Sequence, residues 1–266
     1  MAKFKPPVIE LDDMKMYFGL PYEVDLPSCQ GKFMIYQPTI GEIVEFGESK
    51  FYNTLNIFTT NTTSCRLMLW DMGIDWTEYK DYHLFLLMFG QIDPDAAKLI
   101  FRDFDITKFQ IMKKFAQNNE GEEEEILSLY NPDLDIEINE EAYYNISQYL
   151  RYCFNINPPR KMTDDPILKQ WYIRKDRQEF ENNKKKEESG KVKSSSMQAV
   201  ISACVNHPGF KYNLQQLKDV GVCEFYDSVR RLPTYETSIA ILRGIYGGFV
   251  NSKEVKPDAY NWMKDI

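Results

Sequence analysis

Histidine is scarce in this 266-residue chain: His83 and His207 are the only two, which limits the supply for catalytic triads and zinc sites. The five cysteines are far apart and form no Cys-x-x-Cys pair, a pattern that favours free thiols in a reducing compartment over a disulfide framework. No run of apolar residues approaches the roughly 18 that a membrane-spanning helix needs, and the first residues lack the apolar stretch of a signal peptide. We therefore expect a cytoplasmic protein that does not insert into membranes.

The sequence also lacks the short motifs of nucleotide-binding folds, serine hydrolases, zinc proteases and kinases. It has no excess of basic residues, because 32 Lys and Arg stand against 40 Asp and Glu, a net charge of −8. A broad nucleic-acid-binding face needs cations that neutralise phosphates, so this balance disfavours nucleic acid as a partner. We expect a protein that is not an enzyme and that carries no cofactor or metal.

Hydrophobic periodicity is present, mostly at helical spacing. The sequence Thr39-Ile40-Gly41-Glu42 is a capping-box pattern, and apolar residues at helical spacing follow it as far as Phe58. Gly41 and Gly47 would each weaken this helix by roughly 1 kcal/mol relative to alanine. A close packing contact would explain why glycine stands at these positions.

The predicted fold class is mainly α with a small antiparallel β element (α+β), in one body or in two lobes. Two strands joined by a turn are expected around 107–130, followed by a third short strand near 136–138. A stretch rich in charge, Gly and Ser indicates a linker. The expected parts are an irregular N-terminal arm or loop with room for one short strand (1–32), a helical domain with a small β insertion around 107–138 (33–187), the linker (188–196) and a C-terminal helical subdomain (197–266).

Three patterns allow a chemical interpretation beside a structural one. Cys204 and His207 have a spacing that could contribute to a zinc site or to a nucleophile–base pair, but no second ligand pair exists, so we favour an ordinary helix end. His83 lies among apolar residues and is interpreted as a core or interface histidine. The acidic run at 120–125 lacks the alternating aspartates of a calcium loop, so a solvated hairpin tip is favoured over a cation site.

The segment 159–193 is basic within an acidic chain. It holds 11 Lys and Arg and 7 Asp and Glu, a net charge of +4, which leaves −12 for the other residues. Such a segment can contact nucleic acid or an acidic partner. A solvated helix laced with opposite charges is the favoured interpretation.

Residues 213–232 resemble a helix-turn-helix in which the second helix presents Arg230 and Arg231 and ends at Pro233. Asp227 on that helix would repel phosphates and occupies a place where the motif usually has an apolar residue. Together with 159–193, this region keeps a nucleic-acid-binding or packaging accessory protein as the alternative function.

Aromatic residues are abundant, with 17 Tyr, 17 Phe and 4 Trp beside 11 Met. They suit an aromatic-rich core and an adaptable contact surface equally well. If a partner surface exists, the residues expected to form it are Trp70, Trp76, Tyr79, Phe210, Tyr212, Arg230 and Arg231.

Four stretches carry a family resemblance: IYQPTIGEI at 35–43, LWDMGIDW at 69–76, VNHPGFKY at 205–212 and DSVRRLPTYE at 227–236. In this order they resemble a family of about this length that tailed phages of Gram-positive bacteria encode among their virion and tail-assembly genes. The resemblance implies a tail or baseplate assembly factor, a chaperone or a minor virion component that binds other tail proteins. It implies no catalytic residues, and a place in the bacterial host cytoplasm during assembly or in the virion.

Overall fold

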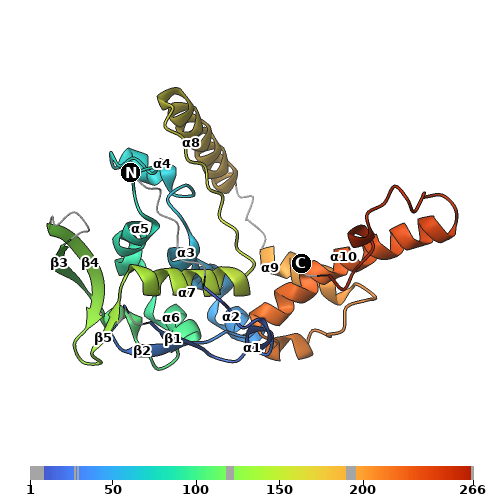
Figure 1. Ribbon diagram of the computed structural model, residues 1–266, viewed down its shortest axis with the longest axis horizontal. Coiled ribbons are helices and arrows are strands. Elements are labelled where there is room, and N and C mark those ends of the chain that lie inside the picture. The colour runs from blue at the N-terminus through green and yellow to red at the C-terminus, as the bar shows by residue number, and fades with distance from the viewer. Residues whose placement is uncertain (1–8, 27, 29, 118–122, 190–195, 265–266) are drawn as a thin grey trace.

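The computed structural model describes residues 9–26, 28, 30–117, 123–189 and 196–264. These residues are mostly helical and form two small antiparallel sheets, which confirms the expected fold class (Figure 1). In chain order the elements are α1 (Asp13–Tyr17), β1 (Tyr22–Asp25), β2 (Lys32–Ile35), α2 (Ile40–Phe46), α3 (Glu48–Thr59), α4 (Arg66–Asp71), α5 (Asp81–Met88), η1 (Phe89–Gln91), α6 (Pro94–Phe101), η2 (Ile106–Lys108), β3 (Gln110–Gln117), β4 (Glu123–Asn131), β5 (Ile136–Ile138), α7 (Glu140–Cys153), α8 (Pro166–Glu188), α9 (Ser196–Val205), η3 (Gln216–Asp219), α10 (Val222–Tyr246) and η4 (Pro257–Ala259).

The β structure consists of the pair β1–β2 and the three-stranded sheet β3-β4-β5, all antiparallel. Gln110 lies opposite Tyr130 in the longer sheet, and β5 pairs with the other edge of β4. The strands expected within 107–138 are therefore confirmed. The turn between β3 and β4 falls at 118–122, outside the described residues.

Helix α7 crosses the middle of the body (Figure 1), and most of its residues are buried. Residues 142–147 are buried without interruption, whereas a surface helix exposes one face. Two hydrogen bonds tie its polar side chains to neighbouring elements: the Tyr22 hydroxyl donates to Asn145 Oδ1 at 2.6 Å, and the Arg151 guanidinium donates to the Thr59 carbonyl at 2.8 Å. The second bond satisfies a carbonyl at the C-terminus of α3 that has no partner within its own helix. The other elements of the body pack around α7.

Gly41, in the first turn of α2, and Gly47, directly after its last residue, have different roles. Thr39 and Glu42 form the expected capping box, with N–H to side-chain distances of 2.7 and 3.2 Å. A Cβ atom on Gly41 would lie 2.6 Å from the Lys218 carbonyl oxygen, so the close contact expected there is confirmed. At Gly47 the expected close contact is wrong, because no atom lies within 4 Å of its Cβ position. Gly47 instead has a φ of 113°, and it divides the predicted helix into α2 and α3.

The N-terminal segment 1–32, expected to be an irregular arm or loop with room for one short strand, contains the strand β1 and also the helix α1. Asp12 caps α1 by accepting the N–H of Lys15 at 3.0 Å. Met16 and Val24 are buried in the main core, so these two elements belong to the body. Helices and strands of five and four residues are too short to give a periodic hydrophobic signal.

The core continues across the expected linker at 188–196. This linker falls between the end of α8 and the start of α9, and its residues 190–195 lie outside the described residues. Beyond it, Met197, Val222 and Phe225 are buried in the same cluster as the residues around α7. Backbone hydrogen bonds join the two parts directly, from Ile40 N–H to the Val220 carbonyl at 2.9 Å.

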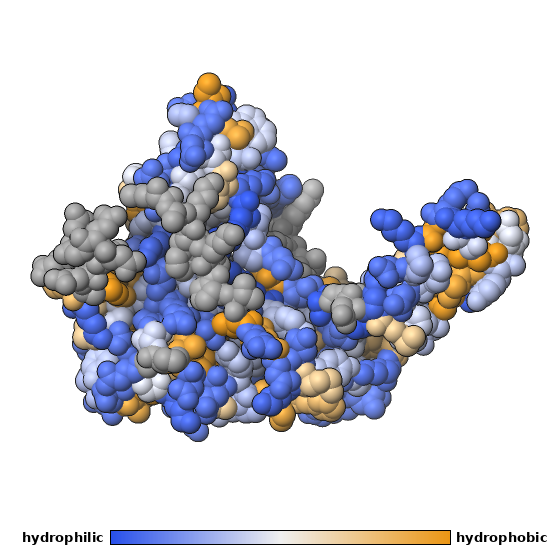
Figure 2. Space-filling model, viewed as in Figure 1, coloured by the Kyte–Doolittle hydropathy of each residue, from blue (hydrophilic) through white to orange (hydrophobic). Residues whose placement is uncertain are grey.

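Two segments project from this body (Figure 1). The outer half of α8, residues 177–188, is exposed along its whole length, and Phe180 is 64% exposed. Residues 235–264, here called the C-terminal arm, comprise the outer part of α10 and the segment that turns back along it. Apolar residues gather on one side of this arm in Figure 2, and Tyr246 and Phe249 at its turn are 84% and 91% exposed. Within the described residues, no helix has both the length and the apolar composition needed to cross a bilayer.

The contact at Gly41 predicts a large cost for one methyl group. Gly41→Ala should lower the free energy of unfolding by about 1–3 kcal/mol, because the Lys218 carbonyl belongs to the backbone and cannot rotate away. Gly90→Ala is the matched control, since no atom lies within 4 Å of its Cβ position. Urea unfolding of both variants measures the difference, and equal midpoints would contradict the packing described here.

Candidate functional site

The first group of expected partner residues, Trp70, Trp76 and Tyr79, lies beneath α8. The Trp76 ring is fully buried, and its indole N–H donates to the Lys161 carbonyl at 3.2 Å. Trp70 packs edge-on against it at 5.9 Å and is 37% exposed, while Tyr79 is half-buried beside the same cluster. The expectation of an exposed Trp76 is therefore wrong, because this ring fills a small second core.

That second core and one ion pair hold α8 against the body. Ile173 is the buried apolar residue that α8 contributes. Arg66 forms two hydrogen bonds of 2.5 Å with the Asp176 carboxylate and lies over the Tyr172 ring at 4.9 Å. Two parallel bonds of this kind fix geometry as well as charge. The packed face of α8 ends near Asp176, and residues 177–188 extend beyond it.

Part of the positive charge at 159–193 is neutralised within the molecule. Partial burial alone would raise the pKa of Asp75. Hydrogen bonds from Lys169 and Thr77 outweigh this effect and keep the pKa of Asp75 below its usual value. Three cations of the basic segment pair with aspartates of the neighbouring body: Lys169 with Asp75, Arg177 with Asp71, and Arg160 with Asp81. Part of the basic segment therefore packs against the acidic body through ion pairs within the chain.

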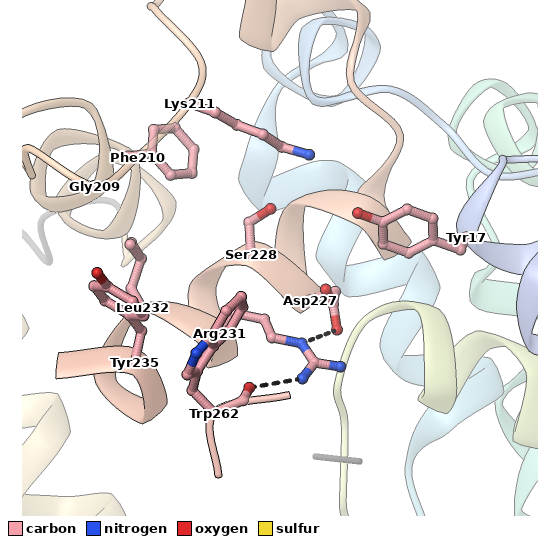
Figure 3. Close-up of a pocket in the computed structure, with 10 residues that line it drawn as sticks. All are labelled: Tyr17, Gly209, Phe210, Lys211, Asp227, Ser228, Arg231, Leu232, Tyr235 and Trp262. Carbon is pink, nitrogen blue, oxygen red and sulfur yellow. Dashed lines mark hydrogen bonds and ion pairs between the residues drawn. The ribbon is translucent and has the colours of Figure 1, made fainter. Parts of the chain in front are cut away.

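The second group, Phe210, Tyr212, Arg230 and Arg231, surrounds a pocket at the base of the C-terminal arm. Phe210 and Arg231 line this pocket, whereas Tyr212 and Arg230 lie next to its lining. The pocket has a volume of about 490 Å³, within the range of roughly 300–1,000 Å³ typical of ligand sites. We call it the aromatic pocket; its lining residues are Tyr17, Gly209, Phe210, Lys211, Asp227, Ser228, Arg231, Leu232, Tyr235 and Trp262 (Figure 3).

Four separate segments bring these side chains together: the end of α1, the loop after α9, α10 itself and the segment that returns along α10. Tyr17 comes from the end of α1, and Trp262 from the segment that returns along α10. The loop after α9 supplies Phe210, whose N–H donates to the His207 carbonyl at 3.0 Å, while the Gly209 N–H donates to His207 Nδ1 at 3.0 Å. Tyr17 and Trp262 were not predicted, because neither the N-terminus nor the C-terminal return shows its proximity to α10 in the sequence.

Arg231 fixes the lower wall of the pocket. Its guanidinium donates to the carbonyl oxygens of Trp262 and Lys264 at 3.2 and 2.7 Å, and its Nε lies 3.6 Å from Asp227 Oδ1. Arg230 faces the same carboxylate at 3.8 Å. Both arginines are therefore engaged within the chain.

Lys211 is the second cation of the pocket. Its Nζ lies 3.4 Å from Glu224 Oε1 and 4.7 Å from the centre of the Tyr212 ring. Burial alone would lower the pKa of Lys211. Its pKa is nevertheless raised above the usual value, by the hydrogen bond with Tyr212 and by the nearby Tyr17 and Glu224. Lys211 therefore carries its positive charge at neutral pH.

The region 213–232 does not form two helices around a turn. Its first part is the short 3-10 helix η3, and α10 then runs through Pro233 to Tyr246. A proline inside a helix removes one hydrogen bond and usually costs about 3 kcal/mol. Here the Thr234 hydroxyl donates to the Arg230 carbonyl at 3.0 Å, and Tyr235 packs on the returning Trp262 at 5.6 Å. The predicted helix end at Pro233 is wrong. The segment that returns along α10 contacts this helix before Pro233, at Arg231, and after Pro233, at Tyr235.

The remaining candidate chemistry gains little from the structure. Cys204 is buried at the end of α9, close in sequence to the His207 side chain that accepts from Gly209. Burial lowers the pKa of His83, which favours its neutral form. Within the described ranges, no three His, Cys, Asp or Glu side chains are grouped to hold a metal ion. The acidic run at 120–125 falls partly on residues outside these ranges.

Comparison with known proteins adds no relative: no family model, no curated protein and no solved structure matches the chain.

The bonds of Arg231 predict a local role. Arg231→Met should release the end of the C-terminal arm and speed its cleavage by a protease about tenfold or more, because two bonds from a charged donor are lost. Arg243→Met on the exposed part of α10 is the matched control and should leave the rate unchanged. Limited proteolysis with mass spectrometry measures both, and equal cleavage of the two variants would contradict the role given to Arg231.

Proposed function

We propose that this chain is a non-enzymatic tail or baseplate assembly factor, or a minor virion component, of a phage, and that it binds other tail proteins. The single observation that carries the proposal is the C-terminal arm, which extends away from the body with Tyr246 and Phe249 at its turn and the aromatic pocket at its base. Such a protein would act in the bacterial host cytoplasm during assembly or stay in the virion.

The arm has the physical properties of a contact surface. Tyr246 and Phe249 are almost completely exposed, although burying apolar surface is worth roughly 25 cal/mol per Å². Ser238 is the buried residue within the outer part of α10, and the apolar residues around it are only partly covered. Aromatic residues supply much of the binding energy at protein interfaces. A partner that covers the arm would gain this energy.

The resemblance to phage tail proteins bears on the same region. Two of its four stretches, 205–212 and 227–236, supply most of the lining of the aromatic pocket. The stretch 35–43 pairs with the residue before α10 through the bridge between Thr39 and Gly221. The tail context rests on the resemblance, and the location of the binding surface rests on the exposed aromatic side chains.

The alternative, a nucleic-acid-binding or packaging accessory protein, has one feature in its favour. Lys184, Lys185 and Lys186 are exposed near the end of the projecting α8. Arg230 and Arg231 support it less, because both face Asp227. A DNA-shift assay at two salt concentrations tests it: binding that falls steeply with salt and disappears in Arg230→Ala/Arg231→Ala would favour the alternative.

The preferred function predicts a loss of partner capture from changes at the arm's turn. Tyr246→Ser/Phe249→Ser should reduce capture of the other purified tail proteins of the same phage at least about tenfold, because two exposed aromatic anchors are removed. Both side chains are exposed, so folding should be unaffected, which thermal unfolding can verify.

Phe115→Ser is the matched control for this experiment. Phe115 is 69% exposed on β3, at the opposite end of the molecule from the C-terminal arm (Figure 1). This variant should capture tail proteins as the natural chain does. Failure of the natural chain to capture any tail protein would refute the proposed function, and full capture by the double variant would refute the role of the arm.

A further inference from the structure

The aromatic pocket has two chemically different ends. Phe210, Leu232, Tyr235 and Trp262 form an apolar end (Figure 3). At the other end, the Lys211 ammonium, the Ser228 hydroxyl and the Tyr17 hydroxyl point toward the same space (Figure 3). A ligand that matches both ends has a large apolar group joined closely to a group that accepts hydrogen bonds.

The charges in the lining indicate that this second group is an anion. Arg231 is matched by Asp227 and by two backbone carbonyls, so it contributes mainly to the wall. Lys211 has three N–H donors, and the carboxylate beside it, Glu224, lies at 3.4 Å, longer than a typical charged hydrogen bond. Lys211 can therefore share its charge with an incoming anion, and the two hydroxyl groups can donate to the same anion.

We infer that the aromatic pocket binds the C-terminal residue of a partner protein, with its apolar side chain at the aromatic end and its carboxylate at Lys211, Ser228 and Tyr17. The side chain and the carboxylate of a C-terminal residue share one Cα atom, so they can reach two adjacent ends of one pocket while the chain leaves through its mouth. Capture of a terminal carboxylate is a known mode of peptide recognition. This inference rests on the proposed function, because it assigns a partner's chain end to the same site.

Three short peptides test the inference by isothermal titration calorimetry on the full chain. Acetyl-Ala-Phe with a free carboxylate should bind at least about tenfold more tightly than its C-terminal amide, since the charge-assisted hydrogen bonds are lost in the amide. Acetyl-Asp-Phe amide carries its carboxylate on a side chain, and it should bind as weakly as the neutral amide.

Two variants assign the difference to the pocket. Lys211→Met should remove the preference for the free carboxylate, whereas Lys218→Met, a nearby exposed lysine outside the lining, should keep it. Phe210→Ala should weaken binding of the carboxylate peptide at least about fivefold through loss of apolar contact. Thermal unfolding verifies that each variant is folded, and Lys211 and Lys218 are both near the surface.

The outcomes separate this inference from the proposed function. Equal binding of the carboxylate and the amide, tighter binding of the acidic side-chain peptide, or no binding of any peptide would overturn the inference, even if tail proteins are still captured. A clear carboxylate preference without capture of any tail protein would leave the pocket as a chain-end site and refute the tail function alone.

Discussion

The structure depends on the burial of most of α7, of which Tyr152 is an exposed residue. A helix covered over most of its surface needs contacts from several directions, and segments far apart in the sequence supply them. Tyr22 from the N-terminal strand stacks on Tyr149 at 4.9 Å and donates to Asn145, while Tyr82 from α5 packs on Tyr143 at 5.6 Å. A buried polar group left without its partner costs about 1–3 kcal/mol. The hydrogen bonds of the Tyr22 and Tyr82 hydroxyls, to Asn145 Oδ1 and to the Ile138 carbonyl, therefore help to fix the arrangement around α7.

The limits of this core determine where the exposed apolar surfaces lie. Because the body is complete around α7, α8 and α10 continue beyond it with no further core to cover them. The outer half of α8 is held at its base by the Arg66–Asp176 pair, and the C-terminal arm by the bonds of Arg231. The aromatic pocket forms where the arm leaves the body. Its shape thus follows from the return of the chain along α10, and a partner bound there would contact the body and the arm together.

Local signals in the sequence predicted local structure well. The capping box at Thr39, the hairpin within 107–138 and the close contact at Gly41 depend on residues whose conformational preferences are strong. Long-range contacts were not predictable in this way. Trp76 has the composition of a contact residue but fills a core under α8, and Pro233 has the sequence of a helix end but lies inside α10. In both places a segment distant in sequence outweighs the local preference. Of the ten residues that line the pocket, Phe210 and Arg231 were singled out from the sequence. Six others come from the same loop and from α10, and Tyr17 and Trp262 come from segments near the two ends of the chain.

Native-state hydrogen exchange tests the central claim, that a body built around α7 carries two less stable projecting segments. Amides of α7 should exchange most slowly and only through global unfolding, because its hydrogen bonds are enclosed by the main core. Those of residues 177–188 and of the C-terminal arm should exchange faster, through local opening. Protection of either projecting segment equal to that of α7, or early exchange within α7 itself, would contradict the account.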